Sequence, residues 1–220
     1  MQTQIELKRF TEGFRNEHRA ARDIFLGIAE ALRSRDAARI GELMGQADAG
    51  IGPHMRYEEE EMYPALASLY GDDYVERMLG DHDRAFGVAG RLMELASHQP
   101  ITDEDIQEGN RLIQHMLPHV TDCDGLVLAI EVPPEDRQRT IFAARDRALA
   151  EGLTMMRWGR AARASSGRAR LGRAVTDRLS VAPGEAVSVM FPAALVGGLR
   201  DIERTDRWTM INRCDPSAER

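Results

Sequence analysis

The chain has 220 residues, of which 43% are hydrophobic and 30% charged, and its formal net charge is −7. This length and balance suit one folded domain with an appendage, and they exclude a disordered tail or a fibrous repeat. Since no apolar run approaches the ~18 residues of a membrane span and the N-terminal segment MQTQIELKRF is too polar for a signal peptide, we expect a cytoplasmic protein without membrane contact.

Apolar residues recur at intervals of three and four along most of the chain, and this period predicts helices. The first predicted helix spans about residues 5–32 and the second about residues 36–70. Gly50, Gly52 and Pro53 are expected to kink or break the second helix midway.

The third and fourth predicted helices complete a set of four. The third spans about residues 72–95. Thr102 and Asp105 have the spacing of a capping box, so the fourth helix is expected from there to about residue 123, with Pro118 disturbing its regularity. Four long helices with short links predict an all-α protein built as an antiparallel four-helix bundle.

Pro133 and Pro134 mark the first plain boundary, because proline suits the first turn of a helix. A fifth helix is predicted from there to about Ala164, and a short strand is possible at residues 186–190. We therefore divide the chain into three parts. They are a four-helix bundle in residues 1–130, an additional helix in residues 131–165 and a C-terminal extension of unknown role in residues 166–220.

Cysteine spacing and the distribution of charge narrow the function. Cys123 and Cys214 form no CxxC motif, which argues against a disulfide framework and a thiolate zinc site and predicts two reduced thiols. Residues 155–180 hold seven arginines against one aspartate, with Trp158 as their only aromatic residue. Without interleaved aromatics this stretch disfavours nucleic-acid binding and favours a solvated or docking face.

Five of the six histidines fall on the four predicted bundle helices, one on each of the first three and two on the fourth. Five imidazoles in one bundle interior are costly to bury unless something satisfies their nitrogens, and imidazole is the commonest protein ligand for transition metals. The sixth, His98, lies in a predicted loop and is expected to take no part. The five candidate ligands are His18, His54, His82, His115 and His119.

Carboxylates on the second helix indicate which metal this cluster holds. His54 and Glu58 are four residues apart and therefore share one helix face, as do the two histidines of the fourth helix. Glu61 shares the His54 face, whereas Glu59 and Glu60 are predicted to point into solvent. One carboxylate between two ions, with nitrogen ligands on either side, suits a dinuclear iron centre better than zinc.

These residues together resemble the hemerythrin, or HHE cation-binding, domain over about residues 4–130. The family pattern is a histidine, an HxxxE followed by an aromatic residue and proline, another histidine, and a second HxxxE. The matching positions are His18, the segment HMRYEEEEMYP from His54, His82 in GDHDRA, and His115. The resemblance implies two non-haem irons bridged by carboxylates and an oxo or hydroxo group. It makes these four histidines terminal iron ligands and Glu58 a bridge.

The chain departs from the family pattern at position 119, where the second HxxxE places its glutamate and this sequence has histidine. His119 removes a bridge and adds a terminal nitrogen. Oxygen-carrying hemerythrins use five histidines and two bridging carboxylates, so Asp122 or Asp124 can supply the second bridging carboxylate. Asp122 shares the face of His119, and Asp124 follows it by the five residues that the carriers use. If neither aspartate reaches the metal site, the site is mononuclear or asymmetric.

Three functions remain open at this point. The first is a di-iron protein that binds or senses dioxygen, nitric oxide or peroxide, with peroxide-decomposing or iron-handling activity as an extension. The second is a di-iron oxidase or oxygenase whose organic substrate is covered by the C-terminal extension. The third is a regulator in which the metal controls a partner surface, with the arginine-rich stretch as the contact. All four tyrosines lie near the predicted site, where a phenol can donate a proton or simply pack.

Overall fold

A computed structural model describes residues 2–166 of the chain. Every regular element in this range is a helix, which confirms the all-α prediction. None of these helices is both long and apolar enough to span a bilayer. The strand predicted at residues 186–190 and the end of the arginine-rich stretch lie outside the described residues.

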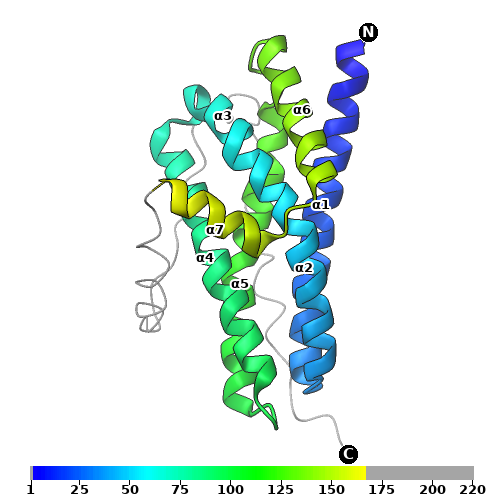
Figure 1. The fold of residues 1–220 in the computed structure, drawn as a ribbon, viewed down its shortest axis with the longest axis vertical. Helices are drawn as coiled ribbons and strands as arrows, with labels where there is room; N and C mark the ends of the chain where they lie inside the picture. The colour runs from blue at the N-terminus through cyan, green and yellow to red at the C-terminus, as the bar shows by residue number, and fades with distance from the viewer. Residues whose placement is uncertain (1, 167–220) are drawn as a thin grey trace, which may run out of the picture. The chain divides into compact units, whose positions relative to one another are not determined.

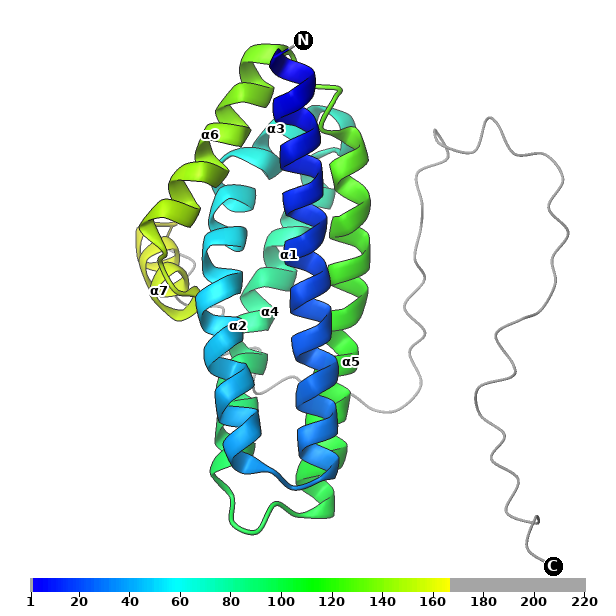
Figure 2. The ribbon, with the colours of Figure 1, turned by 90° about the vertical axis from the view of Figure 1, so that its right-hand side faces the viewer.

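Four long helices run side by side and form the predicted bundle (Figure 1). Around the bundle, α1 contacts α2 and α5, while α4 contacts the same two helices from the other side. The arrangement places one face of each helix toward a shared interior (Figure 2). The bounds are α1 (Gln2–Arg33), α2 (Ala37–Tyr57), α4 (Asp72–Ser97) and α5 (Asp103–Leu126).

Capping side chains fix where two of these helices begin. The Asp36 carboxylate accepts a hydrogen bond from the Arg39 backbone N–H at the start of α2. Thr102 and Asp105 form the predicted capping box at the start of α5. These caps set the register of the two helices that carry paired metal-ligand candidates.

The irregularity expected in the second helix occurs later than the glycines suggest. The helix α2 continues through Pro53, so the expected break at Gly50–Pro53 is wrong. The chain instead forms a π-helix, η1 (Glu58–Met62), and then α3 (Tyr63–Tyr70). Pro64 has no N–H to donate to the carbonyl one α-turn earlier, which disfavours a regular α-helix here. Such π-turns are frequent at functional sites.

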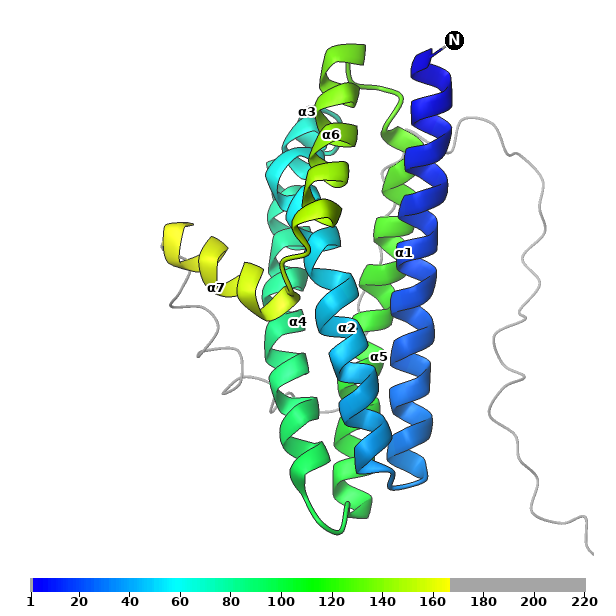
Figure 3. The same cartoon turned by 45° about the vertical axis from the view of Figure 1, so that its right-hand side comes forward.

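The single fifth helix predicted to Ala164 is in fact two helices, α6 (Glu135–Glu151) and α7 (Met155–Ser166). Gly152 ends α6 in the left-handed conformation, with φ of 58°. In Figure 3, α7 runs across the bundle, and it contacts α2 and α4. The turn between the two helices lies against Gly52, where a Cβ atom would collide with the backbone of Leu153–Met155. A short 3₁₀ turn, η2 (Val127–Ala129), follows α5.

The bundle interior holds two apolar core clusters. One contains Ile28, Leu32 and Leu92, toward the loop between α1 and α2. The other contains Phe14 and Met62, toward the end covered by α6. The candidate ligands occupy the levels of the helices between these clusters, so apolar packing closes the site from both ends.

Candidate metal centre

Four of the five predicted histidines converge in the bundle interior. His18 comes from α1, His54 from α2 and His82 from α4, and their residues are 5%, 9% and 1% exposed. His119 on α5 joins them with a side chain that is 11% exposed. The ring centroids of His18 and His54 are 4.4 Å apart, and those of His82 and His119 are 5.0 Å apart. The structure therefore brings together one histidine from each bundle helix.

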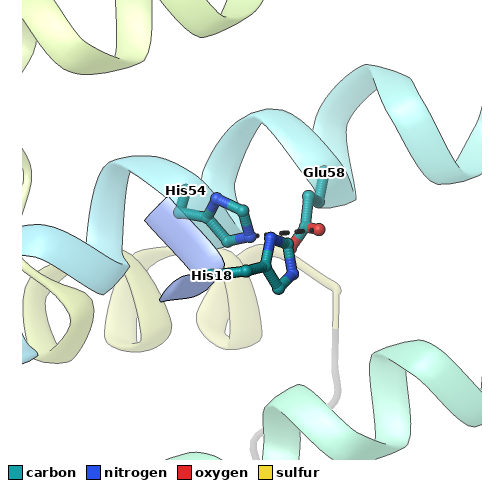
Figure 4. Close-up of side chains that lie close together, drawn as sticks. All are labelled: His18, His54 and Glu58. Carbon is teal, nitrogen blue, oxygen red and sulfur yellow. Dashed lines mark ion pairs between the residues drawn. The ribbon is translucent and has the colours of Figure 1, made fainter. Parts of the chain in front are cut away.

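Glu58 lies between the two pairs of histidines and is completely buried. Its Oε1 is 3.2 Å from His54 Nε2, and its Oε2 is 3.3 Å from His82 Nε2. On one side, donor atoms of His18, His54 and Glu58 all lie within 4.8 Å of one another (Figure 4). One carboxylate therefore faces nitrogen donors on both sides.

The Nδ1 atom of each of the four histidines faces an oxygen atom. His18 Nδ1 is 3.0 Å from the Phe14 carbonyl, and His54 Nδ1 is 2.7 Å from Glu17 Oε2. His82 Nδ1 is 2.9 Å from Glu59 Oε1, and His119 Nδ1 is 3.3 Å from Asp81 Oδ2. These contacts fix the rings and leave the Nε2 atoms for a metal, as in known metal sites.

Arginines from α6 and α7 hold two of these outer carboxylates. Arg145 of α6 donates two hydrogen bonds to Glu17, one of them of 3.0 Å from Nε. Arg163 of α7 donates to both oxygens of Glu59, at 2.9 and 3.0 Å, and to Asp83. The prediction that Glu59 points into solvent is therefore wrong, because its side chain is only 10% exposed. Arg163 likewise is not part of a solvated basic face.

The carboxylates have lowered pKa values, and the histidines divide into two classes. Burial opposes ionisation of Glu58, but the charge of His54 and the close contacts with His54 and His82 hold its pKa well below the ordinary value. Burial also opposes the charged form of His54, yet Glu58 and Glu17 raise its pKa to about 10. The pKa of His82 is raised by Glu58 and Glu59 despite its burial. Without metal, the raised pKa of His54 favours a charged ring beside Glu58, and the pKa of His82 is shifted in the same direction.

The other two histidines are neutral. Burial, followed by the charge of His54, lowers the pKa of His18 to about 4. Burial, followed by the charge of His82, lowers the pKa of His119 to about 3. Each side of Glu58 therefore has one imidazole whose pKa is lowered and one whose pKa is raised, and a metal must displace any proton on the second.

His115 is not part of the cluster, and the prediction that it is a ligand is corrected by its exposed position. The buried face of α5 is defined by Leu112, Met116 and Cys123. At 3.6 residues per turn, His119 lies at the edge of this face. His115, four residues earlier, lies further around the helix and points toward solvent. His98 also lies outside the cluster, as predicted, and its Nδ1 is 2.9 Å from Asp105 Oδ1.

The two aspartates expected to supply a second bridge lie on either side of that buried face. Asp122 pairs with Arg77, at 3.6 Å, instead of facing Glu58. Asp124 has a buried Oδ1 without a hydrogen-bond partner among the described residues, but its carboxylate is not grouped with the candidate ligands. Glu61 is half-buried and also lies outside that group. Within residues 2–166, Glu58 is the carboxylate whose two oxygens face the Nε2 atoms of His54 and His82.

Two phenols and a thiol touch the ligand candidates. The Tyr57 hydroxyl lies 2.9 Å from His54 Nδ1 and donates to Glu17 Oε2 at 2.7 Å. The Tyr63 hydroxyl lies 3.2 Å from His82 Nε2 and 3.3 Å from Cys123 Sγ. Cys123 is a fully buried free thiol that donates to Glu58 Oε1 at 2.8 Å. Tyr70 and Tyr74 stack on each other instead, with centroids 4.9 Å apart.

A cavity of about 140 Å³ adjoins the centre, and all four clustered histidines line it. Most of its other lining residues are apolar and come from the four bundle helices, while Met155 of α7 completes the wall. A cavity of roughly 150 Å³ holds a benzene molecule or a xenon atom. The space beside the histidines therefore suits a small uncharged molecule.

Sequence reasoning missed the residues that surround the ligands. The outer carboxylates Glu17 and Asp81 each precede a ligand histidine by one residue, which is not a specific signal. Arg145 and Arg163 come from helices beyond the bundle, and no local pattern connects them to it. Cys123, by contrast, follows His119 by four residues, which is the spacing of His54 and Glu58 and could have been noticed.

A buried cluster of imidazoles and one carboxylate inside a four-helix bundle defines a metal-binding protein. The model of the hemerythrin HHE cation-binding domain matches residues 9–130, and the chain belongs to this family. The match contains every clustered histidine and Glu58. No curated protein and no solved structure matches the chain.

Proposed function

We propose that the centre holds two iron ions that share Glu58 and that it binds a small ligand, namely dioxygen, nitric oxide or peroxide. His18 and His54 hold the first ion, and His82 and His119 hold the second. The observation that carries this proposal is the position of Glu58, whose two oxygens face nitrogen donors on opposite sides.

The donor set fits metal ions better than it fits an ordinary polar core. Glu58 Oε2 is buried and accepts no hydrogen bond within the described part of the chain. A buried polar atom without a partner is costly, and a cation beside it removes that cost. Imidazole and carboxylate ligands suit iron, and a bound iron pair supplies redox chemistry and an open coordination position.

The surroundings of the centre favour a small ligand. The adjoining cavity of about 140 Å³ is mainly apolar, so a charged metabolite would lose its hydration there without gaining partners. Tyr63 lies within hydrogen-bonding distance of His82 and places a proton donor beside the second position.

Metal analysis of the aerobically purified full chain tests the proposal. We expect two irons per chain and an optical spectrum that changes when nitric oxide is added to the reduced protein. A sample in which His98 is replaced by alanine should match the wild type, because His98 contacts Asp105 and not the cluster. Stoichiometric zinc, or no metal under any loading condition, contradicts the proposal.

A second candidate function is the oxidation of a small apolar organic molecule, and Met155 is the observation that favours it. This residue of α7 forms part of the cavity wall, so an element outside the bundle shapes the space beside the metals. Ala89 also lines the cavity, and Ala89→Leu should fill it at a stability cost of about 1–3 kcal/mol. If the variant still binds nitric oxide but no longer oxidises a benzene-sized substrate, the oxidase function is supported. Absence of turnover in the iron-loaded wild type opposes it.

A further inference from the structure

The hydroxyl of Tyr63 lies at the metal-facing edge of His82. Its oxygen is 3.2 Å from His82 Nε2, and Glu58 Oε2 is 3.3 Å from the same nitrogen. The other ring nitrogen, Nδ1, is 2.9 Å from the outer carboxylate of Glu59. Three donor atoms, one nitrogen and two oxygens, therefore gather on the side of His82 that faces the centre.

The distances between these three atoms are those of neighbouring ligands on one ion. Donors that bind a single ion at about 2.1 Å lie about 3.0–3.4 Å from each other when their angle at the ion is octahedral or tetrahedral. Both distances from His82 Nε2 fall in this range. In addition, Glu58 Oε2 is buried and has no hydrogen-bond partner within residues 2–166, which is independent evidence that a cation belongs beside it.

The π-helix η1 explains how Tyr63 reaches this position. Tyr63 follows Glu58 by five residues, and five residues of a regular α-helix end about 140° away from the starting face. In the structure, the Tyr63 backbone N–H instead donates to the Glu58 carbonyl, which is the hydrogen bond of a π-helix. This wider turn brings Tyr63 back toward the face of Glu58, and its side chain is buried in the bundle interior.

We propose that the phenol oxygen of Tyr63 binds the second metal ion, together with His82, His119 and Glu58. The proposal deepens the proposed function and rests on it. On binding, the phenol O–H bond breaks, an oxygen–metal bond forms and the proton is released to solvent, without a change of oxidation state. The phenol is thus a proton donor in the metal-free chain and an oxygen ligand once the ion is bound.

A second buried phenol, Tyr57, contacts the other half of the centre in a different way. Its hydroxyl lies 2.9 Å from His54 Nδ1 and 2.7 Å from Glu17 Oε2. The His54 nitrogen that faces Glu58 is Nε2, on the other side of the ring. Tyr57 therefore belongs to the outer contacts of the first position, whereas Tyr63 stands among the donors of the second.

Optical and resonance Raman spectra of the iron-loaded full chain in its ferric state test the proposal. A phenolate bound to iron(III) gives a visible charge-transfer band, and excitation in this band enhances the vibrations of the phenol ring. Imidazole and carboxylate ligands give no such vibrations. We expect them in the wild type. Tyr63→Phe should abolish them and weaken binding of one iron by about tenfold or more, whereas the matched control Tyr57→Phe should keep them.

The outcomes separate this proposal from the proposed function. Bound iron without phenolate vibrations in the wild type overturns the tyrosine ligand and leaves metal binding intact. Vibrations that survive in Tyr63→Phe, or that vanish in Tyr57→Phe, overturn it as well. If the wild type binds no iron, the proposed function itself has failed.

A further variant decides the question should Tyr63→Phe not fold. The sequence has four tyrosines, so replacing Tyr57, Tyr70 and Tyr74 together by phenylalanine leaves Tyr63 as the remaining phenol. We expect the iron-loaded triple variant to keep the phenolate vibrations. Their loss in a folded triple variant that still binds iron overturns the proposal.

Discussion

The two halves of the centre share one arrangement of histidines, outer carboxylate and arginine, yet they differ in the residues around it. The half formed by α1 and α2 contains His18 and His54, and the half formed by α4 and α5 contains His82 and His119. In each half, an outer carboxylate contacts a histidine, and an arginine from a helix beyond the bundle donates hydrogen bonds to that carboxylate. These two residues are Glu17 and Arg145 in the first half, and Glu59 and Arg163 in the second.

The difference lies in what completes each half. The donors of His18, His54 and Glu58 gather within 4.8 Å without any other residue. In the other half, the Tyr63 hydroxyl lies 3.2 Å from His82 Nε2, while the Cys123 thiol donates to Glu58 Oε1, the oxygen that faces His54. One carboxylate thus faces two unequal pairs of histidines, and among the described residues the first pair is the one that groups with it within 4.8 Å.

Replacing the shared carboxylate should produce the largest effect. Glu58→Gln removes the charge that both halves use and leaves His54 and His82 facing a neutral amide. We expect metal binding at both positions to be lost, measured as metal per chain after loading and desalting. One retained ion would mean that a half can bind without Glu58.

Removing one histidine should affect one half only. His54→Ala should abolish the first position and cancel the metal-dependent rise in unfolding free energy, which is about 2.7 kcal/mol for an ion present at 100 times its dissociation constant. His115→Ala is the matched control, because that side chain is exposed. Metal content and thermal unfolding with and without metal distinguish the two variants. Equal losses in both would return His115 to the ligand set.

The sequence predicted the bundle well because its signals are local. Helical periodicity, the cap at Thr102 and the four-residue spacing of His54 and Glu58 all act within a few turns of one helix. The sequence predicted both His115 and His119 as ligands, because their spacing does not show which side of α5 is buried. That side is set by packing against α1 and α4, so a small error in the helical phase places an exposed histidine in the interior.

The outer contacts could not be predicted for a different reason. The π-helix at Glu58–Met62 changes the direction of Glu59, and only the folded structure shows that Arg163 meets it. Arg145 reaches Glu17 because Gly13 leaves room, since a Cβ there would collide with the guanidinium. Contacts between residues more than a hundred positions apart leave no pattern in one sequence.

The two arginines should have smaller and separable effects. Once a metal displaces the His54 proton, Arg145 is the remaining cation that hydrogen-bonds Glu17. Arg145→Met should therefore weaken the first position, and Arg163→Met the second, each by about 10–100-fold. Arg139→Met is a suitable control, because Arg139 pairs with Glu135 on the exposed face of α6. Titration of each metal-free variant with zinc and iron provides the affinities, and equal weakening of both positions by either variant would contradict the separation.

The unfolding free energy of the metal-free protein should depend on pH, because the pKa values of its buried histidines are shifted in the folded state. His18 and His119 have folded pKa values of about 4 and about 3, against an ordinary value of 6.5. The unfolded chain therefore takes up their protons first, and stability should fall as the pH decreases below 6.5, by up to about 1.4 kcal/mol per pH unit for each histidine. The charged form of His54 acts in the opposite sense. Its folded pKa of about 10 contributes stability that is full below pH 6.5 and is lost as the pH rises toward 10.

Unfolding of the chelator-treated protein by urea at a series of pH values measures these slopes. His18→Gln should flatten the acid limb between pH 6.5 and about 4, whereas His119→Gln should flatten it down to about pH 3, because burial depresses the pKa of His119 further. Carboxylates such as Glu58, whose pKa is lowered, add their own loss of stability below pH 4.5 in all variants. An acid limb that is identical in the wild type and in both variants would mean that these imidazoles are already protonated in the folded state. The division of each half into one ring with a lowered pKa and one with a raised pKa would then be wrong.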